Sequence, residues 1–127
     1  MLHARILYAE DNALLMQTVK DTLELEGCHV VACRNGTLAR WKLEGDEHFD
    51  LVLLDNELPG INGIELARQA RGLSHRRRTP VVIISASEVG GEARRAGVNA
   101  FLKKPEDINR VVETIERLLA SEKRRKE

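Results

Sequence analysis

Five short apolar runs alternate with amphipathic segments along this chain, and this alternation constrains the fold more than any other feature. Runs this short fit strands, whereas the segments between them repeat apolar residues at helical spacing. Strands that alternate with helices form a parallel sheet with helices on both faces. The sequence therefore predicts an α/β fold of five strand–helix units, doubly wound in a single domain. The strands are predicted at residues 5–9, 29–32, 50–54, 80–84 and 100–102, and the helices at 13–26, 37–43, 63–70, within 88–96 and at 106–120.

Three local features carry expectations about exposure to solvent. The helix at 37–43 is expected to turn Leu38, Trp41 and Leu43 inward. The arginine run at 76–78 lacks aromatic neighbours and predicts a solvated turn rather than a nucleic-acid site. Residues 121–127 are polar and charged, so they are expected to fray as a tail behind a domain at 1–120.

Composition excludes several classes of protein. The 127 residues suffice for one domain with a real core, and 43% apolar and 31% charged residues suit a globular chain. Twenty basic residues balance twenty acidic ones, so no overall field points to nucleic acid or a membrane as partner. The sequence has no apolar stretch of membrane-spanning length, and no secretory signal is expected. Cys28 and Cys33 are expected to be reduced, partly buried thiols of a cytoplasmic protein.

Charged and polar residues stand where four of the predicted strands end. Glu10 and Asp11 follow the first strand, and Asp55 follows the third. Ser85 follows the fourth strand and Lys104 the fifth. The carboxyl ends of parallel strands lie at one edge of the sheet, where ligands bind. Taken singly, each residue has a plainer explanation, such as a turn cap, a charge facing a helix dipole or a solvated lysine. Their coincidence at one edge favours a common site.

These residues also form a known pattern. The matching pieces, in chain order, are Glu10-Asp11, Asp55-x-x-Leu58-Pro59-Gly60-x-Asn62-Gly63, Ser85-Ala86, Phe101 and Lys104-Pro105. With these pieces the chain resembles the receiver domain of bacterial two-component response regulators, over roughly residues 4–120. The resemblance implies a flavodoxin-like sheet with the strand order 2-1-3-4-5.

The resemblance implies that Asp55 accepts a phosphoryl group. An aspartate carboxylate can act as a covalent nucleophile, but here an anion must approach an anionic phosphoryl group. A hard dication bound by oxygen ligands lowers that barrier. In the family's pattern Mg²⁺, or Mn²⁺ in its place, is held directly by Asp11, Asp55 and the main-chain carbonyl of Glu57. Glu10 would bind the ion directly or through water.

The same resemblance assigns the groups that bind the phosphoryl oxygens. Lys104 would form an ion pair, while the hydroxyl of Ser85 and the main-chain N–H of Ala86 would donate hydrogen bonds. The added charge would draw Ser85 and its loop toward the phosphoryl group. Phe101 would then turn inward, as the family's switch aromatic does, and change a protein-binding surface. A cis bond between Lys104 and Pro105 also fits the family's pattern.

The implied function is that of a receiver in a two-component system or phosphorelay. A sensor histidine kinase or a phosphotransfer protein would donate the phosphoryl group, and a downstream protein would read the result. The chain would be a phosphoprotein rather than an enzyme, apart from self-catalysed phosphorylation and dephosphorylation. Neither a membrane nor directly bound nucleic acid is expected as partner. The sequence leaves open the kinase, the target, pairing as a homodimer, and whether this is one part of a longer protein.

Departures from the family's pattern keep two alternatives open. Glu10 stands where aspartate is commoner, and Ser85 replaces the commoner threonine. The interval from Ser85 to Lys104 is about three residues short, so the fourth helix is expected to lose nearly one turn. One alternative is therefore a degenerate receiver that binds partners without phosphorylation. Another is a haloacid-dehalogenase-like phosphatase, but such enzymes need an aspartate two positions after the nucleophile, where this chain has Glu57.

Overall fold

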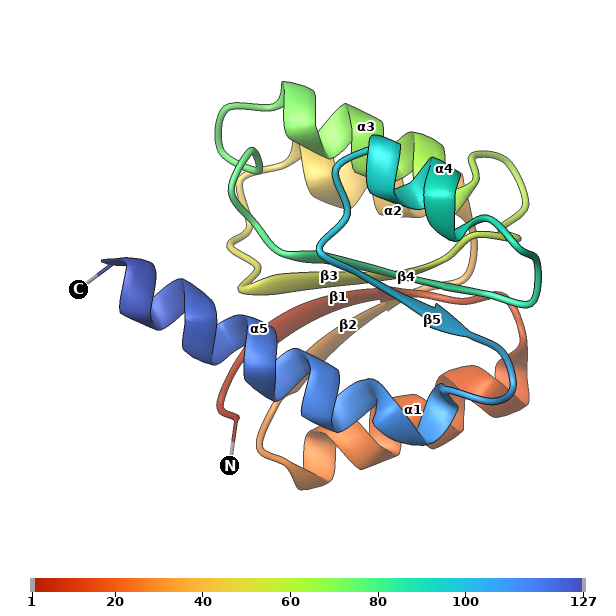
Figure 1. Ribbon diagram of the computed structural model, residues 1–127, viewed down its shortest axis with the longest axis horizontal. Coiled ribbons are helices and arrows are strands. Elements are labelled where there is room, and N and C mark those ends of the chain that lie inside the picture. The colour runs from red at the N-terminus through yellow and green to blue at the C-terminus, as the bar shows by residue number, and fades with distance from the viewer. Residues whose placement is uncertain (1, 127) are drawn as a thin grey trace.

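The computed structural model describes residues 2–126. Its five strands form one parallel sheet in the order β2-β1-β3-β4-β5 (Figure 1). This is the predicted order, so the doubly wound, flavodoxin-like fold is confirmed. The strands are β1 (Arg5–Ala9), β2 (His29–Cys33), β3 (Leu51–Asp55), β4 (Val81–Ser85) and β5 (Ala100–Lys103). The helices are α1 (Ala13–Leu25), α2 (Gly36–Glu44), α3 (Gly63–Gly72), α4 (Gly90–Arg95) and α5 (Val111–Lys126), with a short 3-10 helix, η1 (Ile108–Arg110), before α5.

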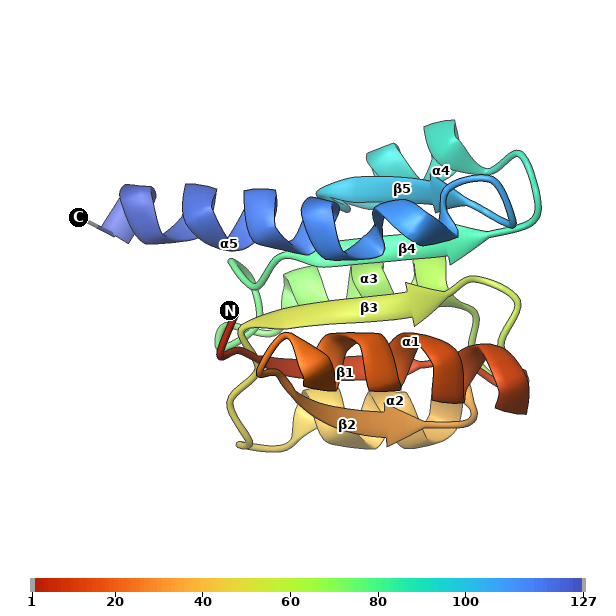
Figure 2. The ribbon, with the colours of Figure 1, turned by 90° about the horizontal axis from the view of Figure 1, so that it is seen from below.

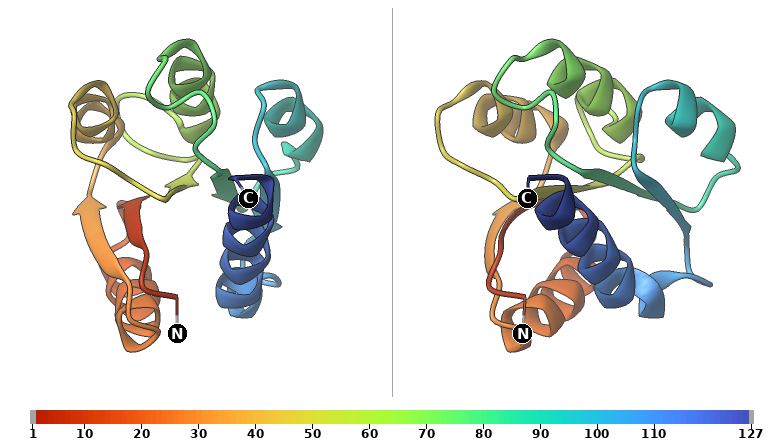
Figure 3. Two further views of the ribbon diagram at one scale, coloured as in Figure 1. Left: turned by 90° about the vertical axis from the view of Figure 1, so that its left-hand side faces the viewer. Right: turned by 60° about the vertical axis from the view of Figure 1, so that its left-hand side comes forward.

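Two helical layers cover the sheet. Helices α1 and α5 lie on one face, and α2, α3 and α4 lie on the other (Figure 3). Strand β3 shows why the apolar runs are uninterrupted. Leu51 and Leu53 belong to the core under α1 and α5, while Val52 and Leu54 belong to the core on the opposite face. All four side chains are buried, as expected for a parallel strand covered on both faces.

The parallel register brings the carboxyl ends of all five strands to one edge of the sheet (Figure 2). Asp55 on β3 is paired with Ile84 on β4, and Ser85 on β4 is paired with Lys103 on β5. Strand β1 lies between β2 and β3, so the strand order changes direction there. In doubly wound sheets a ligand binds beyond the strand ends at this switch point. The fold therefore places the ends of β1 and β3 where a site is expected.

The second helix buries a different face from the one predicted. Leu43 is buried as expected, but Leu38 and Trp41 are 41% and 63% exposed, so their predicted inward orientation is wrong. The helix instead buries its smaller residues, Gly36 among them. A Cβ atom on Gly36 would lie 1.9 Å from the carbonyl oxygen of Ile61, so only a glycine permits this approach to the loop after β3. That contact sets which face of α2 is buried.

The last helix begins and ends later than predicted. Helix α5 starts at Val111, after η1, and continues through Lys126, so residues 121–126 are helical, while their expected fraying stays a prediction. Residue 127 lies outside the described part of the chain. An ion pair between Glu122 and Arg125 supports the final turns. By contrast, α4 spans six residues, as short as the sequence indicated. Neither α5 nor any other described helix is long and apolar enough to cross a membrane.

Arg76 departs from the prediction of a solvated arginine run. Its side chain is buried, whereas Arg77 and Arg78 are exposed. The guanidinium group lies over the ring of Phe49, 4.9 Å from its centroid. Arg76 thus caps the C-terminal end of α2 from the loop between α3 and β4. Its guanidinium donates to four main-chain carbonyl oxygens, those of Lys42, Leu43, Gly45 and Glu47.

Candidate functional site

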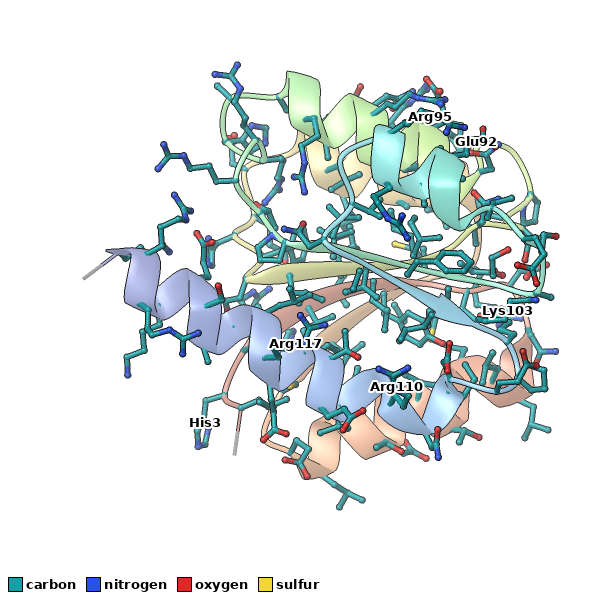
Figure 4. All side chains as sticks on the ribbon, in the orientation of Figure 1. His3, Glu92, Arg95, Lys103, Arg110 and Arg117 are labelled. Carbon is teal, nitrogen blue, oxygen red and sulfur yellow. The ribbon has the colours of Figure 1, made fainter. Side chains whose placement is uncertain are left out.

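The structure brings the predicted site residues to the carboxyl edge of the sheet. Lys103, the last residue of β5, marks this edge in Figure 4. The next main-chain N–H, that of Lys104, donates to the carbonyl oxygen of Ser85 at 2.8 Å, which joins the ends of β4 and β5. The side chains that gather at this edge come from four strand ends: Glu10, Asp11, Asp55, Ser85 and Lys104.

Three carboxylates form an acidic cluster at the switch point. One oxygen each from Glu10, Asp11 and Asp55 lies within 4.8 Å of the other two. Glu10 and Asp55 are buried, whereas Asp11 is exposed, so the cluster is open to solvent on the Asp11 side. Hard divalent cations such as Mg²⁺ and Mn²⁺ prefer an all-oxygen donor set that includes carboxylates. The residues present therefore fit the predicted metal.

Lys104 is the cation of this cluster. Its Nζ atom lies 3.0 Å from Oε1 of Glu10 and 3.2 Å from Oδ1 of Asp55. The other carboxylate oxygen of Glu10 accepts from the main-chain N–H of Asn12 at 3.1 Å. Burial alone would lower the pKa of Lys104, but the hydrogen bonds and charges of the two acids outweigh it and raise that pKa. Lys104 therefore stays protonated and faces Asp55, as predicted.

Asp55 is held in an unfavourable electrostatic environment. Burial raises the pKa of its carboxyl group, and the charge of Glu10 raises it further. Lys104 and the main-chain N–H of Glu57, 3.2 Å from Oδ1, oppose that rise, and the resulting pKa is about 6 against an ordinary 3.8. The Asp55 carboxylate is thus ionised at neutral pH but less stable than an exposed one. A bound dication would relieve this excess of negative charge.

The loop between β3 and α3 is folded tightly against Asp55. A Cβ atom on Gly63 would lie 2.7 Å from the carbonyl oxygen of Asp55, so glycine is needed at the first position of α3. The side chain of Asn56 accepts from the N–H of Ile64 at 2.9 Å, and Asn62 caps the helix. These contacts fix the loop that follows the phosphoacceptor candidate. They explain the Asn–Gly pair in the sequence motif.

Glu57 holds the two groups that were predicted to bind a phosphoryl group. The hydroxyl of Ser85 donates to Oε2 of Glu57 at 2.6 Å, and the N–H of Ala86 donates to Oε1 at 3.1 Å. Ser85 is buried, and its Oγ also accepts from the N–H of Ser87 at 3.0 Å. Sequence reasoning missed this role of the Glu57 side chain, although an acid two residues after Asp55 was a signal. The role of the Glu57 carbonyl as a metal ligand stays a prediction.

Phe101 lies on β5 beneath the start of α4. Its side chain is half-buried and packs against the core on that face of the sheet. A Cβ atom on Gly90, the first residue of α4, would lie 3.5 Å from the Phe101 ring. The bond between Lys104 and Pro105 is cis, in agreement with the family's pattern. Phe101 is therefore placed between the sheet and α4, but its movement stays a prediction.

Comparison with known proteins covers nearly the whole chain. Residues 6–116 match the family profile described as response regulator receiver domain. The polar-differentiation response regulator DivK of Brucella ovis is 31% identical over 117 residues, which are 90% of this chain and 94% of that protein.

Solved structures of receiver domains are also similar to this chain. The receiver domain of the sensor histidine kinase PA1611 from Pseudomonas aeruginosa PAO1, with a magnesium ion coordinated in its active site cleft, is 26% identical. Its TM-score is 0.82, and the match covers 92% of this chain and 98% of that one. A CheY-like receiver domain protein from Methanospirillum hungatei JF-1 is 27% identical with a TM-score of 0.87, covering 95% of this chain and 97% of that one.

Proposed function

Because this chain belongs to the response regulator receiver domain family, we propose that it accepts a phosphoryl group on Asp55 and thereby switches a protein-binding surface. The observation that carries the proposal is the position of Lys104, whose Nζ lies 3.0 Å from Glu10 and 3.2 Å from Asp55. One ammonium group among three carboxylates leaves negative charge that can bind a dication, and that dication would offset the repulsion between Asp55 and an anionic phosphoryl group. The donor would be a sensor histidine kinase or a phosphotransfer protein.

Asp55 supplies the nucleophile. A carboxylate oxygen attacks phosphorus in line with the leaving group, so a P–O bond to Asp55 forms while the bond from phosphorus to the donor's histidine nitrogen breaks. The electron pair of the broken bond stays on that nitrogen. The product is an acyl phosphate on Asp55. Attack requires the ionised carboxylate, which predominates above its pKa of about 6.

The acidic cluster would hold Mg²⁺, or Mn²⁺ in its place. The ligands would be the carboxylates of Asp11 and Asp55 and the main-chain carbonyl of Glu57, with Glu10 direct or through water. When bound, the ion supplies positive charge that offsets repulsion between the carboxylate and the phosphoryl group. Lys104 pairs with a phosphoryl oxygen and orients the group. The magnesium ion in the PA1611 receiver domain supports this assignment.

Phosphorylation would act on the loop between β4 and α4. Ser85 and Ala86 would donate to phosphoryl oxygens, and Phe101 would turn inward beneath α4. The face formed by α4, β5 and α5 would then bind a downstream protein differently. A groove of about 300 Å³ on this face is lined by three arginines, so an acidic partner surface would suit it. The arginines are Arg94, Arg110 and Arg117, the last two of which are labelled in Figure 4.

The test is intact mass after incubation with acetyl phosphate and Mg²⁺. We expect a gain of one phosphoryl group in the parent chain and none in Asp55→Asn. A chain that turns over a phosphate monoester many times would instead be a phosphatase. The protein would act in the cytoplasm. It would not be an enzyme, apart from catalysing its own phosphorylation and dephosphorylation.

One observation favours the alternative of a degenerate receiver. Glu57 already engages Ser85 and Ala86, so those donors are not free in the unphosphorylated chain. If no donor phosphorylates the parent chain, although it still binds Mg²⁺, the degenerate receiver becomes the better description.

A further inference from the structure

We propose that the Glu57 side chain is an internal ligand of the phosphoryl-oxygen subsite, which an incoming phosphoryl group must displace. This inference rests on the proposed function, because it assumes that Asp55 is the phosphoacceptor. It adds a residue that controls how readily the phosphoryl group is held. It also gives the switch two alternative ligands rather than one.

The geometry of the contact is that of a bound oxyanion. Both carboxylate oxygens of Glu57 are used: one accepts from the Ser85 hydroxyl at 2.6 Å and the other from the Ala86 N–H at 3.1 Å. A carboxylate and a phosphoryl group present the same kind of acceptor, namely charged oxygens that attract donors strongly. The two donors can satisfy Glu57 or a phosphoryl group on Asp55, but not both at full strength.

The fold places the Glu57 side chain where it can contact Ser85 and Ala86. Its main-chain N–H donates to Oδ1 of Asp55 at 3.2 Å, so the residue is anchored beside the phosphoacceptor. From there the side chain crosses from the loop after β3 to the loop after β4. Ser85, which it reaches, is buried and its Oγ is oriented by the N–H of Ser87. An aspartate at this position would be one methylene shorter and would reach less far.

Displacement would couple phosphorylation to the release of Glu57. In the unphosphorylated chain, Glu57 holds the loop at Ser85 and Ala86. Once the phosphoryl group takes these donors, two anions face each other and Glu57 moves toward solvent, where it is already exposed. Because the donors exchange one charged ligand for another, part of the phosphoryl group's binding free energy is spent on the exchange. Removing Glu57 should therefore tighten the binding of phosphoryl analogues.

The first experiment titrates the full chain with beryllofluoride, a phosphoryl analogue, at saturating Mg²⁺. We expect Glu57→Ala to lower the apparent Kd by about tenfold, and Glu57→Gln by less, because the amide oxygen still accepts one hydrogen bond. The matched control is Glu88→Ala, which removes one negative charge from the loop after β4. Glu88 pairs with Lys103 and makes no described contact with Ser85 or Ala86, so its removal should change Kd less than about twofold.

A double-mutant cycle separates displacement from simple charge repulsion. If Glu57 acts by holding the Ser85 hydroxyl, the tenfold gain from Glu57→Ala should shrink to about threefold in a Ser85→Ala background. An equal gain in both backgrounds would mean that Glu57 acts only by its charge, and the inference would be overturned. If the parent chain binds beryllofluoride as tightly as Glu57→Ala does, this inference fails while the proposed function stands. If neither binds it, both fail.

A second readout needs no phosphoryl analogue. In the free protein the Ala86 amide is bonded to Glu57, so its proton should exchange with solvent slowly. Glu57→Ala should accelerate that exchange by about tenfold or more and shift the amide resonance, whereas Glu88→Ala should leave both unchanged. An Ala86 amide that is indifferent to the loss of Glu57 would overturn the inference.

Discussion

The two edges of the sheet each contain a buried charged side chain, but the partners of that side chain differ. At the amino edge, Arg76 is 2% exposed and donates to four neutral carbonyl oxygens around the end of α2. At the carboxyl edge, Asp55 is 1% exposed and shares a single ammonium group, that of Lys104, with Glu10. The two charges are almost equally buried, but Arg76 donates to four carbonyl oxygens, whereas Asp55 shares its cationic partner with a second carboxylate.

Arg71 repeats the amino-edge pattern. Its guanidinium donates to the carbonyl oxygens of Gly97 at 3.0 Å and Thr79 at 2.8 Å, and to the side chain of Asn99 at 2.8 Å. These bonds tie the loops at the amino ends of β4 and β5 together. Arg71 is partly buried and Arg76 is buried, and in both the guanidinium donates to several carbonyl oxygens that hold neighbouring loops together. A buried charge left in excess, as at the carboxyl edge, is instead available to a ligand.

The largest effect should come from breaking the amino edge. Arg76→Ala would remove the side-chain donor of the Lys42 and Glu47 carbonyl oxygens and open a cavity beside Phe49. The carbonyl oxygens of Leu43 and Gly45 would lose one of two partners, because the ring of His75 also contacts them. Losses of this kind cost about 3 kcal/mol of unfolding free energy. Urea unfolding of the purified chain measures the difference.

The neighbouring residue supplies the control for that measurement. Arg77 is exposed, so Arg77→Ala should change the unfolding free energy by less than about 0.5 kcal/mol. Equal effects of the two substitutions would mean that Arg76 is no more than a surface charge, and the contrast between the two edges would disappear.

Asp55→Asn should have the opposite sign and stabilise the metal-free protein. The folded-state pKa of Asp55 is about 6 against an ordinary 3.8, so its contribution to stability is fully present below pH 3.8 and is lost as pH rises through 6. One pKa unit corresponds to about 1.4 kcal/mol, which gives at most about 3 kcal/mol. Because the substitution also removes the ion pair between Asp55 and Lys104, we expect the unfolding free energy to rise by about 2 kcal/mol at pH 8.

The pH dependence is the sharper part of this prediction. Urea unfolding in the presence of EDTA should show the parent and Asp55→Asn converging near pH 4 and separating toward pH 8. If Asp55→Asn were the less stable protein at pH 8, the carboxyl edge would be a satisfied ion pair like those that stabilise folds elsewhere.

Bound Mg²⁺ should stabilise the parent chain and so offset part of the destabilisation that the ionised Asp55 causes. A ligand that binds only the folded state at about ten times its Kd adds about 1.4 kcal/mol to the unfolding free energy of the parent chain. Asp11→Ala removes one of the proposed direct ligands, so the same Mg²⁺ concentration should add much less. The comparison uses thermal unfolding with EDTA and then with Mg²⁺. An unchanged Mg²⁺ response in Asp11→Ala would remove Asp11 from the metal site.

Most of the fold and of the carboxyl edge could be predicted from the sequence, because both depend on local signals. Apolar runs between helical segments fix a parallel sheet, and a parallel sheet brings Asp11, Asp55 and Lys104 together whatever the details of packing. Cys28 and Cys33 were expected to be partly buried thiols outside a disulfide, and both are free, with fuller burial than expected. The order of elements predicted the parallel sheet and the common edge, whereas the strand order and the roles of the site residues rested on the resemblance to receiver domains.

The amino edge and α2 could not be predicted because they depend on tertiary contacts. Arg76 stands in an arginine run that looks solvated, and only the path of the loop after α2 brings carbonyl oxygens to it. Trp41 was expected inside because it is large and apolar, but the close approach of Gly36 to Ile61 turns it outward. Likewise, the side chain of Glu57 spans two loops whose separation the sequence does not state.

The smallest effect should come from a carboxylate at the amino edge, Asp50. Burial opposes its ionisation, but the main-chain N–H of Arg5, 2.8 Å away, and His48 outweigh that and lower the pKa of Asp50. Its contribution to stability is therefore present above pH 3.8 and lost as pH falls through the folded-state pKa. Asp50→Asn should destabilise the chain by less than about 1 kcal/mol at pH 7, because the group is partly exposed and asparagine still accepts from Arg5.

Asp50→Asn is the matched counterpart of Asp55→Asn, since both replace a carboxylate at an end of β3 by its amide. Urea unfolding at pH 7 and pH 3 should show the Asp50 variant less stable than the parent at the higher pH, with the gap closing in acid. If both substitutions changed the unfolding free energy with the same sign, burial alone would decide the outcome. Opposite signs would show that partners decide it. Asp50 has the N–H of Arg5 and the ring of His48, whereas Asp55 has the N–H of Glu57 and a lysine that it shares with Glu10.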